Sequence, residues 1–295
     1  MYRYQIPSKV ETNIIGYNSL TKLFADISSQ NDKSVLILFD SCSVFDANLS
    51  ATLGALLDRL TIMGYIIMLN NPANRPVRRS LGRISFLKAW NVETSIQERE
   101  SFIPYRRFNS NNQNEFKSYI DSELLNKRSF PKHSKNAGDK ILESIFEIYA
   151  NAISHGCCDF VYSCGEYKHN SHVLDMTIVD CGTTIPKKVN TFLADHSLNL
   201  LSSIETIKWA FVPGNTTKNQ PGGLGLAILD EFIKLNNGAL QIVSDNAFVQ
   251  IRNNNVESFL LDIPFPGTIV NMSFNFDDKK SYFIKGEFDH PSDLL

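Results

Sequence analysis

The sequence predicts an α/β protein whose first third and second half are built differently. In the first third, apolar runs typical of buried strands alternate with amphipathic helical segments, at residues 34–39, 46–63, 65–69 and 77–90. This order predicts parallel strands with helices packed on a face. In the second half, an apolar strand at 173–179 is followed by late strands at 239–244, 258–263 and 268–276. Such a run of strands predicts an antiparallel sheet with helices on one face.

A polar stretch separates the two parts. Residues 109–114 contain no apolar side chain and predict a loop at a domain boundary. A helix is expected at 115–125, and a second polar break follows at 131–138. We therefore expect four segments: an N-terminal domain at 1–108, a linker and connecting helix at 109–135, a second domain at 136–280 and a C-terminal tail at 281–295.

The composition is that of an ordinary globular protein. Hydrophobic residues make up 43% of the 295 residues and charged residues 20%, which excludes a disordered or collagen-like chain. The formal net charge of −2 gives no overall steering, so no nucleic-acid partner is expected. No apolar run approaches the ~20 residues of a membrane span, and residues 1–9 do not resemble a secretory signal. We expect a cytoplasmic protein without membrane association.

The cysteines favour reduced thiols over a disulfide framework. Their number is odd, and most lie in predicted helices or strands; they are Cys42, Cys157, Cys158, Cys164 and Cys181. Neither CxxC nor HxxxH occurs, so we expect inert buried cysteines rather than a metal–thiolate site.

Basic residues gather near the predicted domain boundary. They are Arg75, Arg78, Arg79, Arg83, Arg106 and Arg107. This cluster is either a solvated helix face or a surface for a phosphate, a nucleic acid or an acidic partner. No interleaved aromatic residues support base stacking.

Polar residues share one stripe of the helix predicted at 139–154. Glu143, Glu147 and Asn151 recur at i, i+4 and i+8. Glu147 and Asn151 are one turn apart, so their side chains can reach one small volume. A carboxylate beside a neutral oxygen ligand suits activation of a hydroxyl or water next to a hydrated Mg²⁺. The alternative is a solvent-exposed polar face.

Asp180 ends the strand predicted at 173–179 and is followed by Cys181-Gly182. An Asp shortly before Gly at a strand end is often only a turn. A buried carboxylate here could also accept a hydrogen bond from an exocyclic amine such as that of adenine.

Three glycines, Gly222, Gly223 and Gly225, precede an apolar helix that is expected to run to about Asn236. Glycine lets backbone N–H groups approach a phosphate, and a helix N-terminus favours negative charge. Lys218, in the flexible stretch 213–221, could reach a phosphate as well. The alternative is an ordinary helix N-terminal turn, and the stretch fits neither the P-loop nor the Rossmann fingerprint.

In this order, the motifs resemble the GHKL ATP-binding fold shared by histidine kinases, gyrase-type topoisomerases, mismatch-repair ATPases and heat-shock chaperones. Glu147-x-x-x-Asn151 with Ala152 and His155 resembles its N box, and Asp180-Cys181-Gly182-Thr183-Thr184-Ile185-Pro186 resembles its G1 box. Residues 215–226 resemble its ATP lid and G2 box, and Pro266-Gly267-Thr268 resembles its last motif. The resemblance covers about residues 136–277 and implies an α/β sandwich, a mixed sheet with helices on one face. One residue departs from the pattern, because Thr184 stands at the second glycine of the G1 box.

The resemblance implies a role for each matching residue, with ATP and Mg²⁺ as cofactors. Asn151 would bind Mg²⁺, and Glu147 would be the general base or would polarise the attacking group. Asp180 would read the adenine amine, supported by Thr268 through water. Lys218 and the backbone at Gly223 and Gly225 would hold phosphates. The implied ATP site also includes Gly182, Thr217 and Leu224, and residues 211–221 would form a mobile lid.

The N-terminal part resembles a STAS domain, the class of the anti-anti-sigma factors that GHKL-type anti-sigma kinases phosphorylate on Ser or Thr. The resemblance rests on residues 36–39, Asp46, the helix ending at Met63, residues 64–69, Asn71-Pro72 and residues 77–87. The family's usual acceptor pair corresponds to Ala47-Asn48, which carries no hydroxyl, and Ser50 and Thr52 lie a turn further on. The resemblance therefore implies a docking or regulatory domain rather than a phospho-acceptor of the usual kind.

Together the resemblances imply a regulatory ATPase or kinase that phosphorylates a partner on Ser/Thr or switches partners with its ATP state. The implied partner is a STAS-like or effector protein, and a homodimer is left open. The alternative is a non-catalytic, nucleotide-gated interaction protein. A histidine kinase would need an acceptor histidine on a dimerisation hairpin, but residues 108–138 contain only His133, in a loop-like setting.

Overall fold

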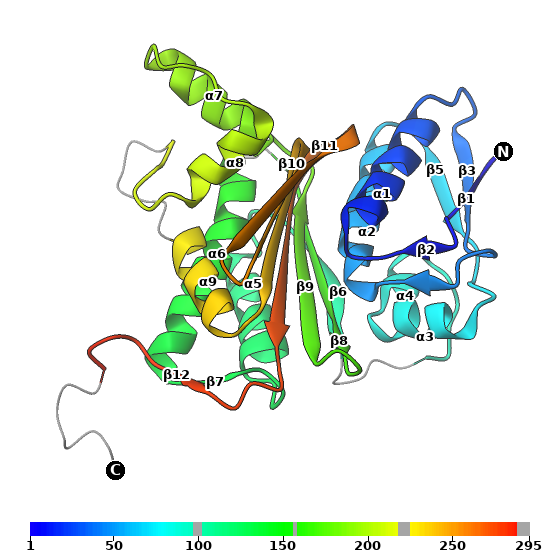
Figure 1. Cartoon of the computed structure of the whole chain (residues 1–295). Coiled ribbons are helices and arrows are strands. Elements are labelled where there is room, and N and C mark those ends of the chain that lie inside the picture. The colour runs from blue at the N-terminus through cyan, green and yellow to red at the C-terminus, as the bar shows by residue number, and fades with distance from the viewer. Residues whose placement is uncertain (97–101, 156–157, 218–224, 288–295) are drawn as a thin grey trace.

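The computed structural model describes residues 1–96, 102–155, 158–217 and 225–287. Its elements form layers, with a five-stranded sheet in the middle and helices on both of its faces (Figure 1). A three-stranded sheet forms the outermost layer on the side of the N-terminus. The prediction of an α/β fold is confirmed.

The N-terminal part is a three-stranded parallel sheet with two crossover helices. The strands pair in the order β1-β3-β5, which are Tyr2–Gln5, Ser34–Leu38 and Ile66–Leu69. Helix α1 (Ile14–Ser28) connects the first two strands, and α2 (Ser50–Ile62) connects the last two. The parallel pairing predicted from the alternating pattern is therefore confirmed.

Shorter elements complete this part. Strands β2 (Lys9–Val10) and β4 (Val44–Phe45) pair in parallel, and a 3₁₀ turn, η1 (Ala47–Leu49), leads into α2. The single helix predicted at 77–90 is instead two helices, α3 (Arg75–Arg83) and α4 (Phe86–Ala89). Between them Ser85 has a φ of 62°, and this left-handed conformation interrupts the helix.

The central sheet has the strand order β10-β11-β9-β8-β6. In chain order the strands are β6 (Phe102–Phe108), β8 (Val161–Lys168), β9 (Val173–Asp180), β10 (Ala239–Arg252) and β11 (Asn255–Asn275). All the pairs described are antiparallel, so this sheet matches the strand pattern but differs from the mixed sheet that the resemblance implied. The three late strands predicted from the sequence belong to one long hairpin, with register shifts around Asp245.

One face of the central sheet is covered by α5 (Gln113–Ile120), α6 (Lys135–His155) and α9 (Gly225–Leu235) (Figure 1). A π-helical turn, η2 (Asp121–Leu125), follows α5. The apolar stripe of α6 packs into this core through Ile141, Ile145 and Ala152. Helices α7 (Ile185–Asp195) and α8 (Ser203–Phe211) lie at one end of the sheet and contact β10.

The other face of the central sheet is covered by α1 and α2 of the N-terminal part (Figure 1). One continuous core joins the two parts and includes Leu53 and Leu56 of α2 with Cys164 and Val179 of the sheet. The helices of the second half thus cover one face, as predicted, while the N-terminal helices bury the face that would otherwise be exposed.

Hydrogen bonds and ion pairs also cross this interface. Lys168 Nζ lies 2.7 Å from an oxygen of Asp46 across the interface, and 2.9 Å from an oxygen of Asp175 within the central sheet. The Ala47 N–H donates to Glu166 Oε2 at 2.8 Å, and burial raises the pKa of Glu166 to about 7.

The same interface covers the residues at the acceptor position of the STAS-like pattern. Asn48 is fully buried and donates from Nδ2 to Thr177 Oγ1 and Asn271 Oδ1, both at 3.0 Å. Ser50 and Thr52 are fully buried as well. This surface of the N-terminal part is therefore docked against the central sheet of the same chain.

The sheets do not divide the chain at residue 108. Strand β6 lies within the segment expected to form the N-terminal domain, but it pairs with β8 of the central sheet. The segment expected as a tail begins with β12 (Ser281–Tyr282), which pairs with β7 (Lys132–His133). Tyr282 is buried and packs edge-on against Phe232.

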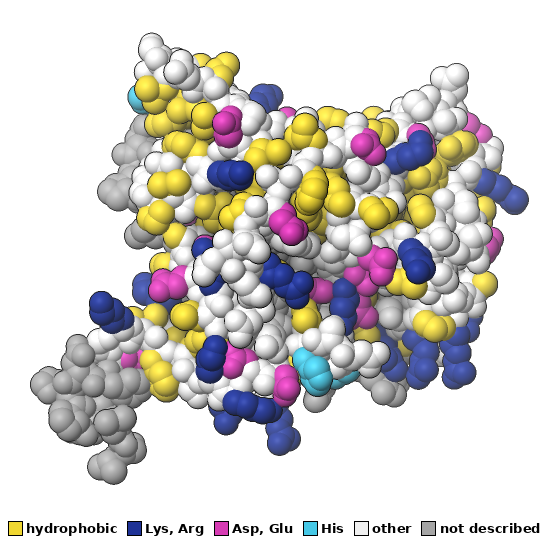
Figure 2. All heavy atoms as spheres, in the orientation of Figure 1, with side chains coloured by type: hydrophobic (Ala, Val, Ile, Leu, Met, Phe, Trp, Pro, Cys, Tyr) yellow, Lys and Arg dark blue, Asp and Glu magenta, His cyan; other side chains and the backbone are white. Residues whose placement is uncertain are grey.

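The predicted arginine cluster is split by the fold. Arg75 and Arg79 are exposed on α3, and Figure 2 shows Lys and Arg side chains gathered over the region of α3 and α4. Arg107 instead forms an ion pair with Asp58 of α2, with Nη1 2.7 Å from Oδ2.

Within the described ranges, no helix combines the length and apolarity needed to cross a membrane. Four of the cysteines, Cys42, Cys158, Cys164 and Cys181, are free thiols, and Cys157 lies outside the described residues.

Candidate functional site

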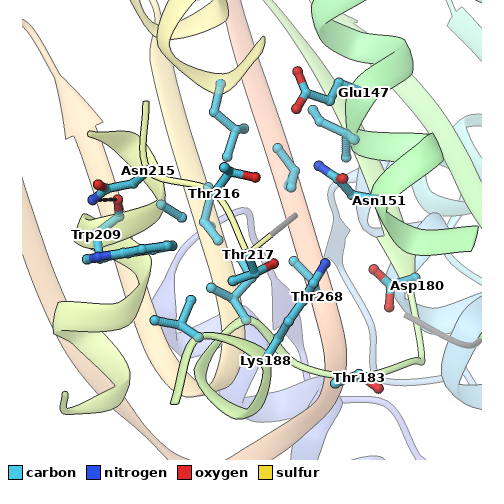
Figure 3. A pocket seen from close by; sticks show the side chains of 17 residues that line it. Glu147, Asn151, Asp180, Thr183, Lys188, Trp209, Asn215, Thr216, Thr217 and Thr268 are labelled. Atoms are coloured by element: carbon cyan, nitrogen blue, oxygen red, sulfur yellow. Dashed lines mark hydrogen bonds between the residues drawn. The ribbon is translucent and has the colours of Figure 1, made fainter. Parts of the chain in front are cut away.

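A pocket opens between α6, α7, α8 and the end of the central sheet (Figure 3). Its polar lining comprises Glu147, Asn151, Asp180, Thr183, Lys188, Asn215, Thr216, Thr217 and Thr268. Its apolar lining comprises Ile148, Ile185, Val189, Trp209, Ala210, Leu226, Ile242 and Val270. Apolar walls with a few polar groups are typical of a small-molecule or cofactor site.

Helix α6 supplies Glu147 and Asn151. Because they are one turn apart, both side chains project from the same side of α6, and both line the pocket (Figure 3). The buried face of the same helix, which includes Ile145 and Tyr149, fixes its position against the sheet. The structure therefore brings both side chains to one small volume, as their spacing predicts.

Asp180 is the last residue of β9 and is only 7% exposed. Its Oδ1 accepts a hydrogen bond of 2.8 Å from the N–H of Gly182. Burial raises the pKa of Asp180 to about 7, although the Gly182 N–H and the ammonium of Lys188 oppose the rise. The pocket therefore holds a carboxyl group that titrates near neutral pH and can accept a hydrogen bond from a ligand.

Thr268 lies directly opposite Asp180 in the pairing of β11 with β9. Its hydroxyl is 3.0 Å from the hydroxyl of Ser244, which is fully buried and also hydrogen-bonds to the carbonyl of Gly267. A Cβ on Gly267 would lie 2.0 Å from the carbonyl oxygen of Asp180, so only glycine permits this approach of the two strands. Ser244 was not predicted from the sequence.

Thr184, the departure from the glycine pattern, has a local structural role. It is the N-cap of α7, and its hydroxyl accepts a hydrogen bond of 3.3 Å from the N–H of Lys187. Its φ of −69° requires no glycine. The helix that it starts places Lys188 in the pocket wall (Figure 3).

The chain after α8 closes another side of the pocket. A capping box of Ser202 and Glu205 starts α8, which carries Trp209. Asn215 Nδ2 donates to the carbonyl of Trp209 at 2.9 Å, and this bond fixes the turn that presents Thr216 and Thr217 (Figure 3).

The predicted site residues fall into three groups. Glu147, Asn151, Asp180, Thr217 and Thr268 all line one pocket. Gly182 donates its N–H to Asp180, and Gly225 is the first residue of α9. Lys218, Gly223 and Leu224 lie outside the described residues, as does the lid beyond Thr217.

Among the polar and aromatic residues that line the pocket, five were not predicted: Thr183, Lys188, Trp209, Asn215 and Thr216. Thr183, Asn215 and Thr216 lie inside the motif-like stretches 180–186 and 215–226, so the sequence indicated their segments but not these residues. Lys188 and Trp209 lie on helices that were not predicted, and no spacing in the sequence marked them.

No family model and no curated protein matches this chain.

Proposed function

We propose that the chain is an Mg·ATP-binding regulatory protein of the histidine kinase-like (GHKL) class. The observation that supports this proposal is the convergence of five predicted residues on one pocket. Glu147, Asn151, Asp180, Thr217 and Thr268 are separated by up to about 120 residues of chain, and they come from α6, β9, β11 and the segment after α8.

Asp180 is the adenine-reading group in this proposal. Its carboxylate accepts a hydrogen bond from the exocyclic amine, and Thr268 supports the contact from the neighbouring strand. The apolar side chains around them, including Ile242 and Val270, suit the faces of a base. A guanine would present a carbonyl to the carboxylate, so ATP is preferred to GTP.

Asn151 and Glu147 act at the phosphate end. Asn151 offers a neutral amide oxygen, a ligand type that suits Mg²⁺, and Mg²⁺ is commonly held by one or two side chains together with substrate phosphates. The bound ion would neutralise phosphate charge. Glu147, one turn away, would accept a proton from the attacking hydroxyl or water.

Two observations bear on the histidine-kinase alternative and on the choice of partner surface. Against a histidine kinase, His133 lies in β7, where its Nδ1 is 2.8 Å from the carbonyl of Pro131 and its ring contacts Phe130. It is therefore held within the fold rather than presented on a helix hairpin. For a partner switch, the STAS-like surface at Ala47-Asn48 is occupied by the chain's own sheet, so a protein partner would use another surface.

Trp209 offers a direct test, because it lines the pocket and is one of two tryptophans in the chain. Adding Mg·ATP to the full chain should change tryptophan fluorescence in a saturable way, and Trp209→Phe should remove the signal. Glu147→Ala should keep ATP binding but lose phosphate release or transfer if the protein is an enzyme. If the wild type binds ATP without any turnover, the nucleotide-gated alternative replaces the enzyme. If millimolar ATP neither changes fluorescence nor binds by calorimetry, the proposal fails.

A further inference from the structure

One side chain of the N-terminal part reaches the loop that follows Asp180. Arg59 of α2 donates from Nη1 to the carbonyl oxygen of Cys181 at 2.8 Å. The N–H of the next residue, Gly182, donates to Asp180 Oδ1 at 2.8 Å. The Cys181 carbonyl and the Gly182 N–H belong to the same peptide group, so one peptide is held at both ends.

The two hydrogen bonds depend on each other for a physical reason. A peptide group is planar, so fixing the direction of its C=O also fixes the direction of its N–H. A charged donor at the oxygen also polarises the peptide and strengthens its N–H as a donor. Arg59 therefore both aims and strengthens the bond that holds the Asp180 carboxylate.

We infer that Arg59 is a positioning residue, through which α2 of the N-terminal part orients the ligand-reading carboxylate of Asp180 by way of the Cys181–Gly182 peptide. As a statement about ligand binding, this inference rests on the proposed function. It assigns the N-terminal part a role in the site although the pocket-lining residues that the structure describes all come from the second half of the chain. The docked N-terminal part thereby tunes nucleotide affinity.

The neighbouring elements support this arrangement. Asp58, beside Arg59 on α2, accepts hydrogen bonds from Tyr162 Oη at 2.9 Å and from Arg107 Nη1 at 2.7 Å. These bonds fasten the C-terminal half of α2 to strands β8 and β6. Gly267 permits the close approach of β11 on the other side of the loop, where a Cβ would lie 2.7 Å from the Cα of Cys181.

Other charged groups near the loop define the controls. Lys188 of α7 opposes the rise in the pKa of Asp180. Burial and Asp180 raise the pKa of the neighbouring Cys181 thiol, as do Cys158 and Asp58, whereas Arg59 lowers it. Arg107 is the matched control for Arg59, because it is also an arginine bonded across the α2–sheet interface but it contacts Asp58 rather than the loop.

The test follows the titration of Asp180 in the full chain without ligand, by carbon-13 NMR of its carboxyl group. The signal is assigned by its absence in Asp180→Asn. In Arg59→Met the titration midpoint should move up by about 0.5–1 pH unit, because the carboxylate loses an aligned donor. Arg107→Ala should leave the midpoint unchanged, because Tyr162 still donates to Asp58 and holds α2 against β8.

Two conservative variants separate positioning from a simple charge effect. Arg59→Lys keeps a charged donor, and Arg59→Gln keeps a neutral donor. If the peptide is positioned through the hydrogen bond, both should restore part of the wild-type midpoint. Restoration by Lys alone would show a through-space charge effect and overturn the inference, as would an unchanged midpoint in Arg59→Met. If Arg59→Met does not fold, Arg59→Gln against Arg59→Lys decides the same question.

ATP affinity is the second readout. Arg59→Met should weaken ATP binding about tenfold, whereas Arg107→Ala should change it less than about twofold. Wild-type affinity retained by a folded Arg59→Met would overturn the role in ligand binding. A wild type that binds no ATP would sink the proposed function, and the ligand-free titration would still decide whether Arg59 positions Asp180.

Discussion

Replacing Asp180 by Asn changes the pH dependence of folding in a predictable direction. Asn has nearly the same shape and keeps an oxygen that can accept the Gly182 N–H, but it cannot ionise. In the folded protein burial raises the pKa of Asp180 from 3.8 to about 7. Between these two values the folded chain keeps a proton that the unfolded chain has lost, so wild-type stability falls as the pH rises through this window.

The size of the effect follows from that difference. Each pH unit between the two pKa values costs about 1.4 kcal/mol, so the upper limit by pH 8 is about 4 kcal/mol. Only the part of this window above pH 5 falls within a pH 5 to 8 measurement, two units up to the folded pKa of about 7, so we expect a difference of about 2–3 kcal/mol across that range. Asp180→Asn lacks this loss and should gain stability relative to the wild type as the pH rises from 5 to 8.

Urea unfolding of both proteins at pH 5, 6, 7 and 8 measures this difference. Glu166 also contributes a loss of stability in this range, because burial raises its pKa to about 7, but it contributes equally to both proteins. The difference between the two curves therefore isolates Asp180. Parallel curves across the range would refute the reasoning, because they would mean that Asp180 carries no burial penalty in the folded state.

Three further predictions concern other residues. Asn151→Ala should remove the Mg²⁺ dependence of ATP affinity, measured by calorimetry with and without EDTA; a dependence that persists would place the ion elsewhere. Gly267→Ala should lower the free energy of unfolding in urea by about 1–3 kcal/mol, because its Cβ meets the Asp180 carbonyl at 2.0 Å, and wild-type stability would contradict that contact. Glu166→Gln should reduce the loss of stability between pH 5 and 8, because burial raises the pKa of Glu166 to about 7, and the part due to Asp180 should remain; an unchanged pH dependence of urea unfolding would contradict the burial of Glu166.

The elements with strong periodicity were predictable from the sequence, and so was the placement of Glu147 and Asn151 on one side of a helix. The helix containing Glu147 and Asn151 and the strand ending at Asp180 carry apolar patterns that local rules read correctly. Because the spacing of Glu147 and Asn151 alone puts them on one side of a helix, their meeting at the pocket followed as well.

What the sequence did not predict depends on contacts between distant segments. The polar stretch at 109–114 places residues 102–108 in the N-terminal domain, and nothing local indicates that they form strand β6, which pairs with β8 about 60 residues later. No pattern in the sequence distinguishes Arg59 from other polar residues of a helix. Its contact with the Cys181 carbonyl exists only because α2 packs on the central sheet. A fragment limited to residues 130–295 would lack β6 and expose the face that α1 and α2 cover, so binding tests need the full chain.

Calorimetry of the full chain with ATP and with GTP, each with and without Mg²⁺ at pH 8, tests the central claim most directly. We predict saturable ATP binding that is stronger with Mg²⁺, together with much weaker GTP binding. At this pH the ionised carboxylate of Asp180 accepts a hydrogen bond from the adenine amine but cannot donate one to the guanine carbonyl. Equal heats for ATP and GTP would contradict the assignment of Asp180 to adenine. No binding heat at millimolar ATP would contradict the nucleotide site itself.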